Sequence, residues 1–177
     1  MKVTDITSRE MLSNYLNLND LTNRGAEIGV LRGGHARCIL KKWKGDTLFL
    51  IDVWKNIENK KAALNRLKEF ENRCKIIHKS SINAANEIRN ESLDFCYIDA
   101  NHKYEYIYVD IRTWWDKVKP GGLLCGHDYG AGPDYGPFRW PAVAKVVNEF
   151  VAERNLTLHV EPPILRNITS WYITKNG

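Results

Sequence analysis

The sequence has no long uninterrupted apolar run, and this absence narrows the class of protein. Its apolar stretches are a handful of residues long, whereas a membrane-spanning helix needs about 20. The first ten residues, MKVTDITSRE, contain no apolar segment of the kind found in a secretory signal peptide. We therefore expect a cytoplasmic protein that makes no use of a membrane.

Closely spaced cysteine pairs are also missing. The four cysteines are more than 20 residues apart, and none forms the CxxC pattern that structural zinc sites use. Three of them lie in apolar runs typical of a core. We expect reduced, buried thiols at Cys38, Cys74, Cys96 and Cys125.

The chain has little charge bias outside one segment, although its net charge is +5. Residues 41–79 carry eleven basic and five acidic side chains, whereas the rest of the chain carries fifteen basic and sixteen acidic ones. Much of this basic segment has the spacing of an amphipathic helix with its charged side in water. We therefore expect a solvated helix face, and nucleic acid is disfavoured as a partner.

Internal repeats and linkers are absent too, and 177 residues is the length of one domain. Strand-like apolar segments alternate with helix-like amphipathic ones. This alternation predicts a single α/β domain over residues 1–177 with a doubly wound, mostly parallel sheet. The expected strands are 26–30, 47–54, 74–78, 93–99 and 122–129, and the expected helices are 8–18, 35–43, 59–72, 84–88, 104–118 and one that begins at Pro141.

The C-terminal part departs from this alternation. KPGG, residues 119–122, is expected to stop the preceding helix and turn the chain. LTLHVE and SWYIT are typical of a closing pair of strands, with an antiparallel strand at the C-terminus. The irregular piece from Tyr129 to Trp140 suits a flap over a pocket, and a passive surface loop is the alternative.

Candidate functional residues should lie at strand ends, because ligands of open α/β sheets bind at the carboxyl ends of the strands. The first strand leads into Glu27-Ile-Gly29-Val-Leu-Arg-Gly33, whose glycines permit a sharp turn close to a ligand. An ordinary turn is the alternative. The spacing is not the GxGxxG of a dinucleotide site, and the Glu27 carboxylate favours a cation or hydroxyls over phosphate. A nicotinamide oxidoreductase is therefore disfavoured.

The second strand ends in an acidic residue, Asp52. A carboxylate at this place can accept hydrogen bonds from both hydroxyls of a ribose. It could instead cap the following helix, but an aspartate that closes an apolar strand is costly to bury without a partner. We therefore expect Asp52 to contact a ligand.

Two further carboxylates end neighbouring strands. Asp99 follows the fourth strand and Asp128 the fifth, so that both should converge on one point and need a cation. Oxygen ligands suit Mg²⁺, and also Ca²⁺ or Mn²⁺. His102, three residues after Asp99, is placed to remove a proton from a hydroxyl near neutral pH, with a structural role at a helix start as the alternative. For His127 a structural hydrogen-bonding role is equally compatible.

Together these segments resemble the class I S-adenosylmethionine-dependent methyltransferases. Within that class they are most similar to small divalent-cation-dependent O-methyltransferases of the macrocin type and, more distantly, of the catechol type. The likeness runs from Glu27 to about Val151. EIGVLRGG resembles the family's first motif, IDVW its ribose-binding strand end, and DFCYIDANHKYEYIYVDIRTWWDKVKPGGLLCGHDY its most specific stretch. The resemblance implies a Rossmann-like methyltransferase sheet.

The resemblance also assigns roles to particular residues. It places Glu27 and Gly29, with Gly33 of the same motif, at the methionine part of S-adenosylmethionine, and Asp52 at its ribose. It implies that Ser81 lies near the adenine, that Asp99 borders the cofactor, and that Asp99 and Asp128 hold the metal. Asp99 and His102 are then the catalytic residues.

The chain departs from the catechol type at two positions. Catechol-type enzymes have lysine three residues after the first aspartate and asparagine after the second, whereas this chain has His102 and Tyr129. At both positions the chain is more similar to the sugar-modifying branch of the family. They leave the third metal ligand open.

We therefore expect methyl transfer to a hydroxyl of a small molecule or sugar. A nucleic-acid methyltransferase that uses residues 41–79 is one alternative. Another is a catalytically inactive protein that binds an adenosyl cofactor, which would need neither His102 nor the aspartate pair. The sequence leaves the oligomeric state open, including a homo-oligomer.

Overall fold

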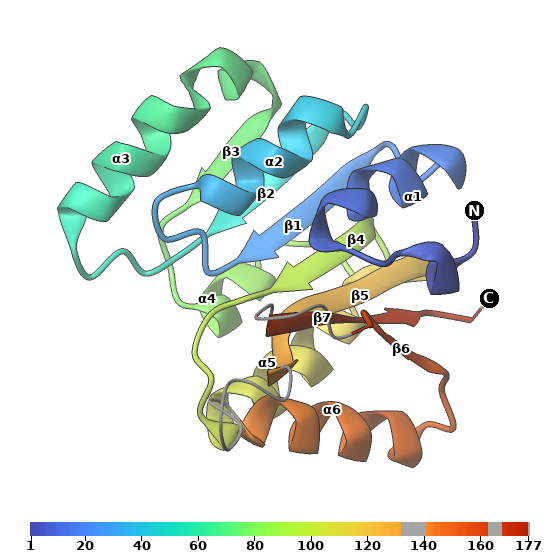
Figure 1. Ribbon diagram of the computed structural model, residues 1–177. Coiled ribbons are helices and arrows are strands. Elements are labelled where there is room, and N and C mark those ends of the chain that lie inside the picture. Colours follow the sequence, from blue (N-terminus) through green and yellow to red (C-terminus); the bar gives the residue numbers. More distant parts are fainter. Residues whose placement is uncertain (132–140, 163–167, 177) are drawn as a thin grey trace.

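The described part of the chain forms a seven-stranded sheet with helices on both faces (Figure 1). The computed structural model describes residues 1–131, 141–162 and 168–176. The strands are β1 (Arg24–Ile28), β2 (Thr47–Ile51), β3 (Cys74–Ile77), β4 (Leu93–Ile98), β5 (Val118–Ala131), β6 (Leu158–Val160) and β7 (Ile168–Thr174). The helices are α1 (Leu12–Leu18), α2 (Gly34–Lys42), α3 (Ile57–Leu67), α4 (Ser81–Ala85), α5 (Tyr104–Trp115) and α6 (Pro141–Glu153), and short 3-10 turns are η1 (Val3–Asp5), η2 (Arg9–Met11) and η3 (Lys68–Arg73).

The sheet order is β3-β2-β1-β4-β5-β7-β6, and its first five strands are parallel. β7 runs antiparallel to both β5 and β6, so the predicted closing pair is confirmed. The order reverses between β1 and β4, which is where ligands of such sheets bind. The expected doubly wound, mostly parallel α/β fold is therefore confirmed.

Two apolar layers cover the sheet, one on each face. Along β4, Phe95 and Tyr97 face the layer that contains α1, α2 and α3, whereas Cys96 and Ile98 face the layer that contains α4, α5 and α6. Such burial on both faces explains the nearly unbroken apolar runs of the central strands. Each large side chain buried there contributes about 1.5–3 kcal/mol to folding.

The helices differ from the expected ranges mainly at their ends. The basic helix α3 starts after Asn56, whose side chain accepts a hydrogen bond from the Glu58 amide, and it tightens into η3. Only Ala63 and Leu67 of α3 are buried, so the expected solvated face is confirmed. No helix in the described ranges is long and apolar enough to cross a membrane.

The expectation of a turn at residues 119–122 is wrong, because these residues lie within β5. The strand accommodates Pro120 at an irregularity, where the register with β4 shifts between Leu93 and Phe95. The amide of Gly121 donates to the carbonyl of Lys175 at 2.7 Å, and that of Lys175 donates to Gly122 at 2.9 Å. Lys175, which follows the end of β7, therefore stabilises as a strand a segment whose local sequence is typical of a turn.

The cysteines also differ from expectation. All four are free thiols, but only Cys96 and Cys125 are buried, whereas Cys74 is partly buried and Cys38 exposed. Cys38 lies on α2, whose buried side chains are Ala36, Ile39 and Leu40. Residues 132–140 lie outside the described ranges, so the flap stays a prediction.

Gly29 directly follows β1 and lies against the backbone at the end of β4. Its φ is +94°, and its amide donates to the carbonyl of Ile51 at 2.9 Å. A Cβ atom at this position would lie 2.1 Å from the carbonyl oxygen of Asp99. The fold itself therefore requires glycine at the point where the two central strands end.

We predict that Gly29→Ala destabilises the protein more than Gly121→Ala does. Both glycines have positive φ, but a Cβ at Gly121 would meet nothing within 4 Å of the described residues. Both variants lose the left-handed preference of glycine, whereas Gly29→Ala adds a clash with backbone worth about 1–3 kcal/mol. Urea unfolding measures the difference, and equal losses in the two variants would contradict the tight approach of β1 to β4.

Candidate active site

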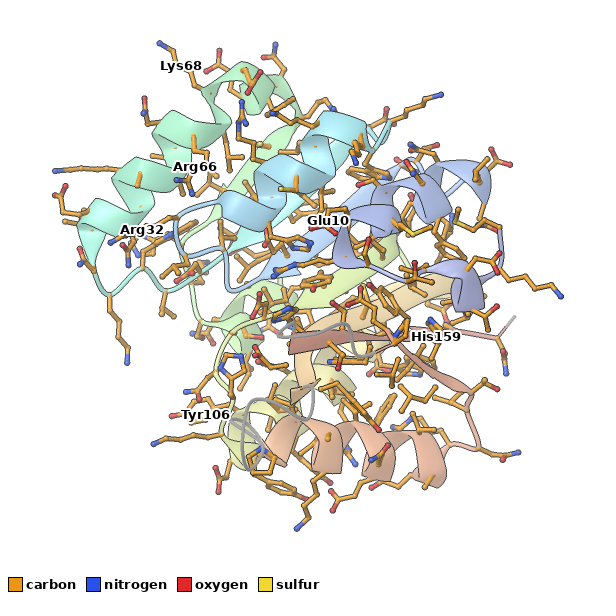
Figure 2. All side chains as sticks on the ribbon, viewed as in Figure 1. Glu10, Arg32, Arg66, Lys68, Tyr106 and His159 are labelled. Atoms are coloured by element: carbon orange, nitrogen blue, oxygen red, sulfur yellow. The ribbon has the colours of Figure 1, made fainter. Side chains whose placement is uncertain are left out.

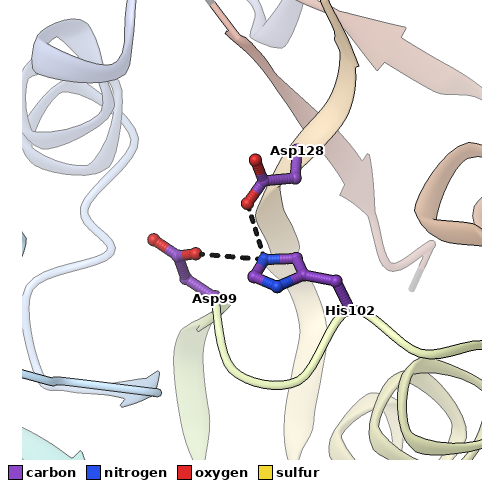
Figure 3. A group of neighbouring side chains, drawn as sticks. All are labelled: Asp99, His102 and Asp128. Carbon is purple, nitrogen blue, oxygen red and sulfur yellow. Dashed lines mark ion pairs between the residues drawn. The ribbon is translucent and has the colours of Figure 1, made fainter. Parts of the chain in front are cut away.

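The carboxyl ends of β1, β4 and β5 form the candidate site, because these strands are parallel neighbours at the point where the order reverses. Asp99 directly follows β4, Asp128 lies near the end of β5, and His102 comes from the segment between β4 and α5 (Figure 3). Ligand atoms of these three side chains all lie within 4.8 Å of one another. The two aspartates therefore converge, as the order of the strands led us to expect, and His102 joins them.

The imidazole of His102 bridges the two carboxylates. Its Nε2 lies 2.6 Å from Oδ2 of Asp128 and 3.7 Å from Oδ1 of Asp99 (Figure 3). Nδ1 of His127 lies 3.4 Å from the same oxygen of Asp128, which gives His127 a structural contact at the site. Asp128 has φ +60°, an uncommon backbone for a residue with a side chain, beside the register shift of β5 and β7.

These contacts change the protonation of the site. Burial lowers the pKa of His102, but hydrogen bonds to Asp128 and Asp99 and their negative charges outweigh it and raise this pKa to about 9. Burial raises the pKa of Asp128, but the contacts with His102 and His127 outweigh it and hold this pKa below its usual value. His102 is therefore an imidazolium at neutral pH in this arrangement. It can take up a proton only once the two carboxylates are otherwise neutralised.

A positively charged residue that the sequence analysis missed completes this cluster. Nη2 of Arg9, from η2, lies 2.8 Å from Oδ2 of Asp99. The guanidinium carbon of Arg9 lies 5.1 Å from the centre of the Tyr97 ring. No local signal marks Arg9, because ninety positions separate it from Asp99 in the chain.

Glu27 is buried at the end of β1, with 1% of its surface exposed. Its Oε1 lies 3.2 Å from Nδ1 of His35, on α2, whereas its buried Oε2 has no hydrogen-bond partner in the described part of the chain. Burial raises the pKa of Glu27 to about 8, against the opposing effect of Arg9, and burial lowers the pKa of His35. Glu27 thus carries a proton at neutral pH in the structure without a ligand, in contrast to the free carboxylate expected from sequence, and a positively charged group bound beside it would favour release of this proton.

Asp52 directly follows β2 and binds the loop that follows β1. Its two carboxylate oxygens accept hydrogen bonds from the amides of Leu31, at 2.8 Å, and Trp54, at 2.7 Å. The indole of Trp54 in turn donates to the carbonyl of Leu31 at 2.8 Å. Each carboxylate oxygen keeps a further lone pair, so Asp52 can still accept from hydroxyl groups.

Gly33 and Ser81 both have contacts within the protein that the sequence did not indicate. Gly33 caps α2 with φ +71°, and a Cβ there would lie 3.2–3.3 Å from Leu67 and Ala63 of α3. The hydroxyl of Ser81, at the start of α4, accepts a hydrogen bond from the indole of Trp114 at 2.7 Å. Ser81 also hydrogen-bonds Asp110, whose pKa burial raises to about 6.

Comparison with known proteins identifies the family. Residues 26–129, more than half of the chain, match the family described as "Methyltransferase domain". The chain therefore belongs to this family. The matched range runs from within β1 to near the end of β5. It includes Glu27, Asp52, Asp99, His102 and Asp128.

Individual proteins show the same likeness. The protein R132 of Acanthamoeba polyphaga mimivirus is 28% identical over 152 residues, which is 81% of this chain and 65% of that protein. An O-methyltransferase from Bacillus cereus, solved in complex with SAH, has a TM-score of 0.74 at 14% identity and covers 98% of this chain and 84% of its own. The O-methyltransferase TomG from Streptomyces achromogenes, solved with SAM, has a TM-score of 0.74 at 17% identity, over 95% of this chain and 79% of its own. At these identities the solved structures establish the shared fold.

We predict that the cluster makes stability depend on pH between about 6.5 and 9 in EDTA. The pKa of His102 is higher in the folded protein, about 9, than in the unfolded chain, about 6.5. Its stabilisation is therefore complete below pH 6.5 and is lost as the pH rises through 9. Relative to His102→Gln, the wild-type free energy of unfolding should fall by up to about 3 kcal/mol over this range. Urea unfolding at several pH values tests this, and a pH-independent difference between the two proteins would exclude the bridged imidazolium.

Proposed function

We propose that this protein is an S-adenosylmethionine-dependent O-methyltransferase that acts with a divalent cation on a hydroxyl of a small molecule or sugar. The observation that carries the proposal is the cluster of Asp99, His102 and Asp128 at the strand ends of a methyltransferase-family domain. A protein that only bound an adenosyl cofactor would not require two aspartates and a histidine at one point. The cluster therefore favours catalysis over binding alone.

The residues present suit the cofactor. Oε2 of Glu27 is a buried acceptor that lacks a partner in the described structure, at the end of β1 where the methionine part would lie. Asp52 would accept from the ribose, with lone pairs left beside its two amide contacts. The remaining contacts would come from Gly29, Gly33, Ser81 and Asp99.

A divalent cation also suits the site. Asp99 and Asp128 offer hard oxygen ligands, which favour Mg²⁺ and are compatible with Ca²⁺ or Mn²⁺. Nε2 of His102 already lies at the same point, which makes His102 the candidate for the open third ligand position if it does not serve as base. An imidazole ligand would make the site less suited to Mg²⁺ and Ca²⁺, which prefer oxygen ligands.

Each residue of the site would have a separate role in methyl transfer. When bound, the cofactor supplies the methyl group and the cation lowers the pKa of the acceptor hydroxyl. Asp99 and Asp128 hold the acceptor's side of the site, whereas Asp52 and Glu27 fix the cofactor, so that the reacting atoms are aligned. His102 accepts the hydroxyl proton at Nε2 once its two carboxylates are engaged by other positive charge.

A nucleic-acid acceptor receives less support. The basic side chains of residues 41–79 spread over α3 and its surroundings, where Figure 2 labels Arg32, Arg66 and Lys68. Several are already engaged: Arg66 donates to the carbonyl of Arg32, and Lys61 pairs with Glu58. The hollow of about 830 Å³ between α2 and α3 is lined by basic side chains, among them Arg66 and Lys68, and also by the acidic Glu69 and Glu71. Such mixed charge is a poor phosphate surface.

The cation is tested first without an acceptor. Mn²⁺ titration followed by electron paramagnetic resonance should show saturable binding that EDTA reverses. Asp99→Asn and Asp128→Asn should each weaken it by about 10-fold or more, because one of two carboxylates is lost. Glu105→Gln, which removes an exposed acid from the first turn of α5, is the matched control and should bind like the wild type. Equal Mn²⁺ binding in all four proteins would exclude the site.

Methyl transfer is then measured with labelled S-adenosylmethionine and a panel of catechols, hydroxylated sugars and RNA. The proposal expects label on a hydroxyl compound, lost in EDTA and in the two aspartate variants. His102→Ala should lower turnover by about 10²- to 10⁴-fold with cofactor affinity nearly intact. Label on RNA alone, or turnover that persists in excess EDTA, would overturn the proposal.

A further inference from the structure

Arg9 enters the candidate site from outside the family-matched range. It begins the short turn η2, and its side chain reaches the end of β4. Nε2 of His159, on β6, donates a hydrogen bond to the carbonyl of Ile6 at 3.0 Å. The N-terminal segment is therefore fixed to the body of the domain, and Arg9 is held in place rather than projecting freely.

Arg9 has hydrogen-bonding capacity that its contact with Asp99 does not use. Nη2 donates to Oδ2 of Asp99 at 2.8 Å, and the guanidinium lies 5.1 Å from the Tyr97 ring centre. Its Nε is buried and has no hydrogen-bond partner within the described residues. Leaving a buried donor without a partner is unfavourable, so such groups usually mark the place of a ligand or an ordered water.

An acceptor without a partner lies in the same group of side chains. Oε2 of Glu27 is buried, and the Glu27 side chain is only 2% exposed. The charge of Arg9 acts on both Glu27 and His35, and the His35 ring lies 4.1 Å from the Tyr97 ring that Arg9 also contacts. Arg9 and Glu27 thus flank Tyr97 with one unused donor and one unused acceptor.

An α-amino acid group complements this pair. Its carboxylate accepts hydrogen bonds, its ammonium group donates them, and one carbon atom joins the two. We infer that Arg9 binds the carboxylate of the methionine part of S-adenosylmethionine while Glu27 accepts from its ammonium group. The inference rests on the proposed function, and it makes Arg9 the residue that distinguishes cofactors with the carboxylate from those without it.

A purely structural role for Arg9 makes a different prediction. If Arg9 only fixes Asp99, its loss should weaken every adenosyl ligand by a similar factor. If Arg9 binds the carboxylate, its loss should affect only ligands that carry this group. A comparison of two ligands in one variant therefore separates the two roles.

The test is calorimetric titration with S-adenosylmethionine and with its decarboxylated analogue, in EDTA so that metal at Asp99 does not contribute. The wild type should prefer S-adenosylmethionine by about 10- to 100-fold, and Arg9→Ala should abolish that preference. Arg112→Ala is the matched control, because Arg112 also pairs with a carboxylate, Glu153, and lies 3.6 Å from the Tyr108 ring centre. This variant should keep the wild-type preference.

Each remaining outcome decides a different question. An undiminished preference in Arg9→Ala, or an equal loss for both ligands, would overturn the role of Arg9 while leaving the proposed function intact. If the wild type binds neither ligand, the proposed function fails and this inference with it. Should Arg9→Ala not fold, Arg9→Gln, which keeps a long polar side chain without the charge, is judged by the same ratio.

Discussion

Three acidic side chains meet at one edge of the sheet, and balancing their charge is the constraint on which the rest of the site depends. Glu27, Asp99 and Asp128 end parallel neighbouring strands, so they cannot separate without disrupting the sheet. The structure balances each of the three charges in a separate way. Asp99 pairs with Arg9, Asp128 pairs with His102, and Glu27 keeps a proton. The site therefore holds positive charge that a bound cation and a sulfonium cofactor could replace.

The backbone explains why these charges are so close. Gly29 allows the end of β1 to contact the backbone of Asp99, and no other residue fits there without displacing β4. On the next strand, Asp128 takes a left-handed conformation where the pairing of β5 with β7 is interrupted. Backbone strain of this kind is held only where the surroundings enforce it, as happens at functional sites.

The parts of this picture that follow from local sequence were predictable. Continuous apolar runs identified the strands, and their last residues identified Glu27, Asp52, Asp99 and Asp128. What could not be predicted depends on distant partners. Backbone hydrogen bonds to Lys175 stabilise KPGG as a strand, although its local sequence is typical of a turn. Trp114 and Asp110 form hydrogen bonds with the hydroxyl of Ser81.

Distance in the chain also hid the positive charges. Arg9 has no periodicity or motif that connects it with Asp99, and the protonation of Glu27 follows from burial that only the folded chain creates. His102 was identified as a candidate base, but its bridge between two carboxylates, and therefore its raised pKa, requires the geometry of β4 and β5 together. Sequence thus located the acids, and the structure supplied the groups that neutralise them.

The central claim is that these strand ends bind S-adenosylmethionine, and calorimetric titration of the purified protein with that cofactor tests it most directly. The account predicts saturable binding to the wild type that Asp52→Asn weakens by about 10-fold or more, because a charge-assisted contact with the ribose is lost. The thermal stability of the variant, measured on the same preparation, controls for the two amide contacts of Asp52. No detectable binding by the wild type, or undiminished binding by a folded Asp52→Asn protein, would contradict the account.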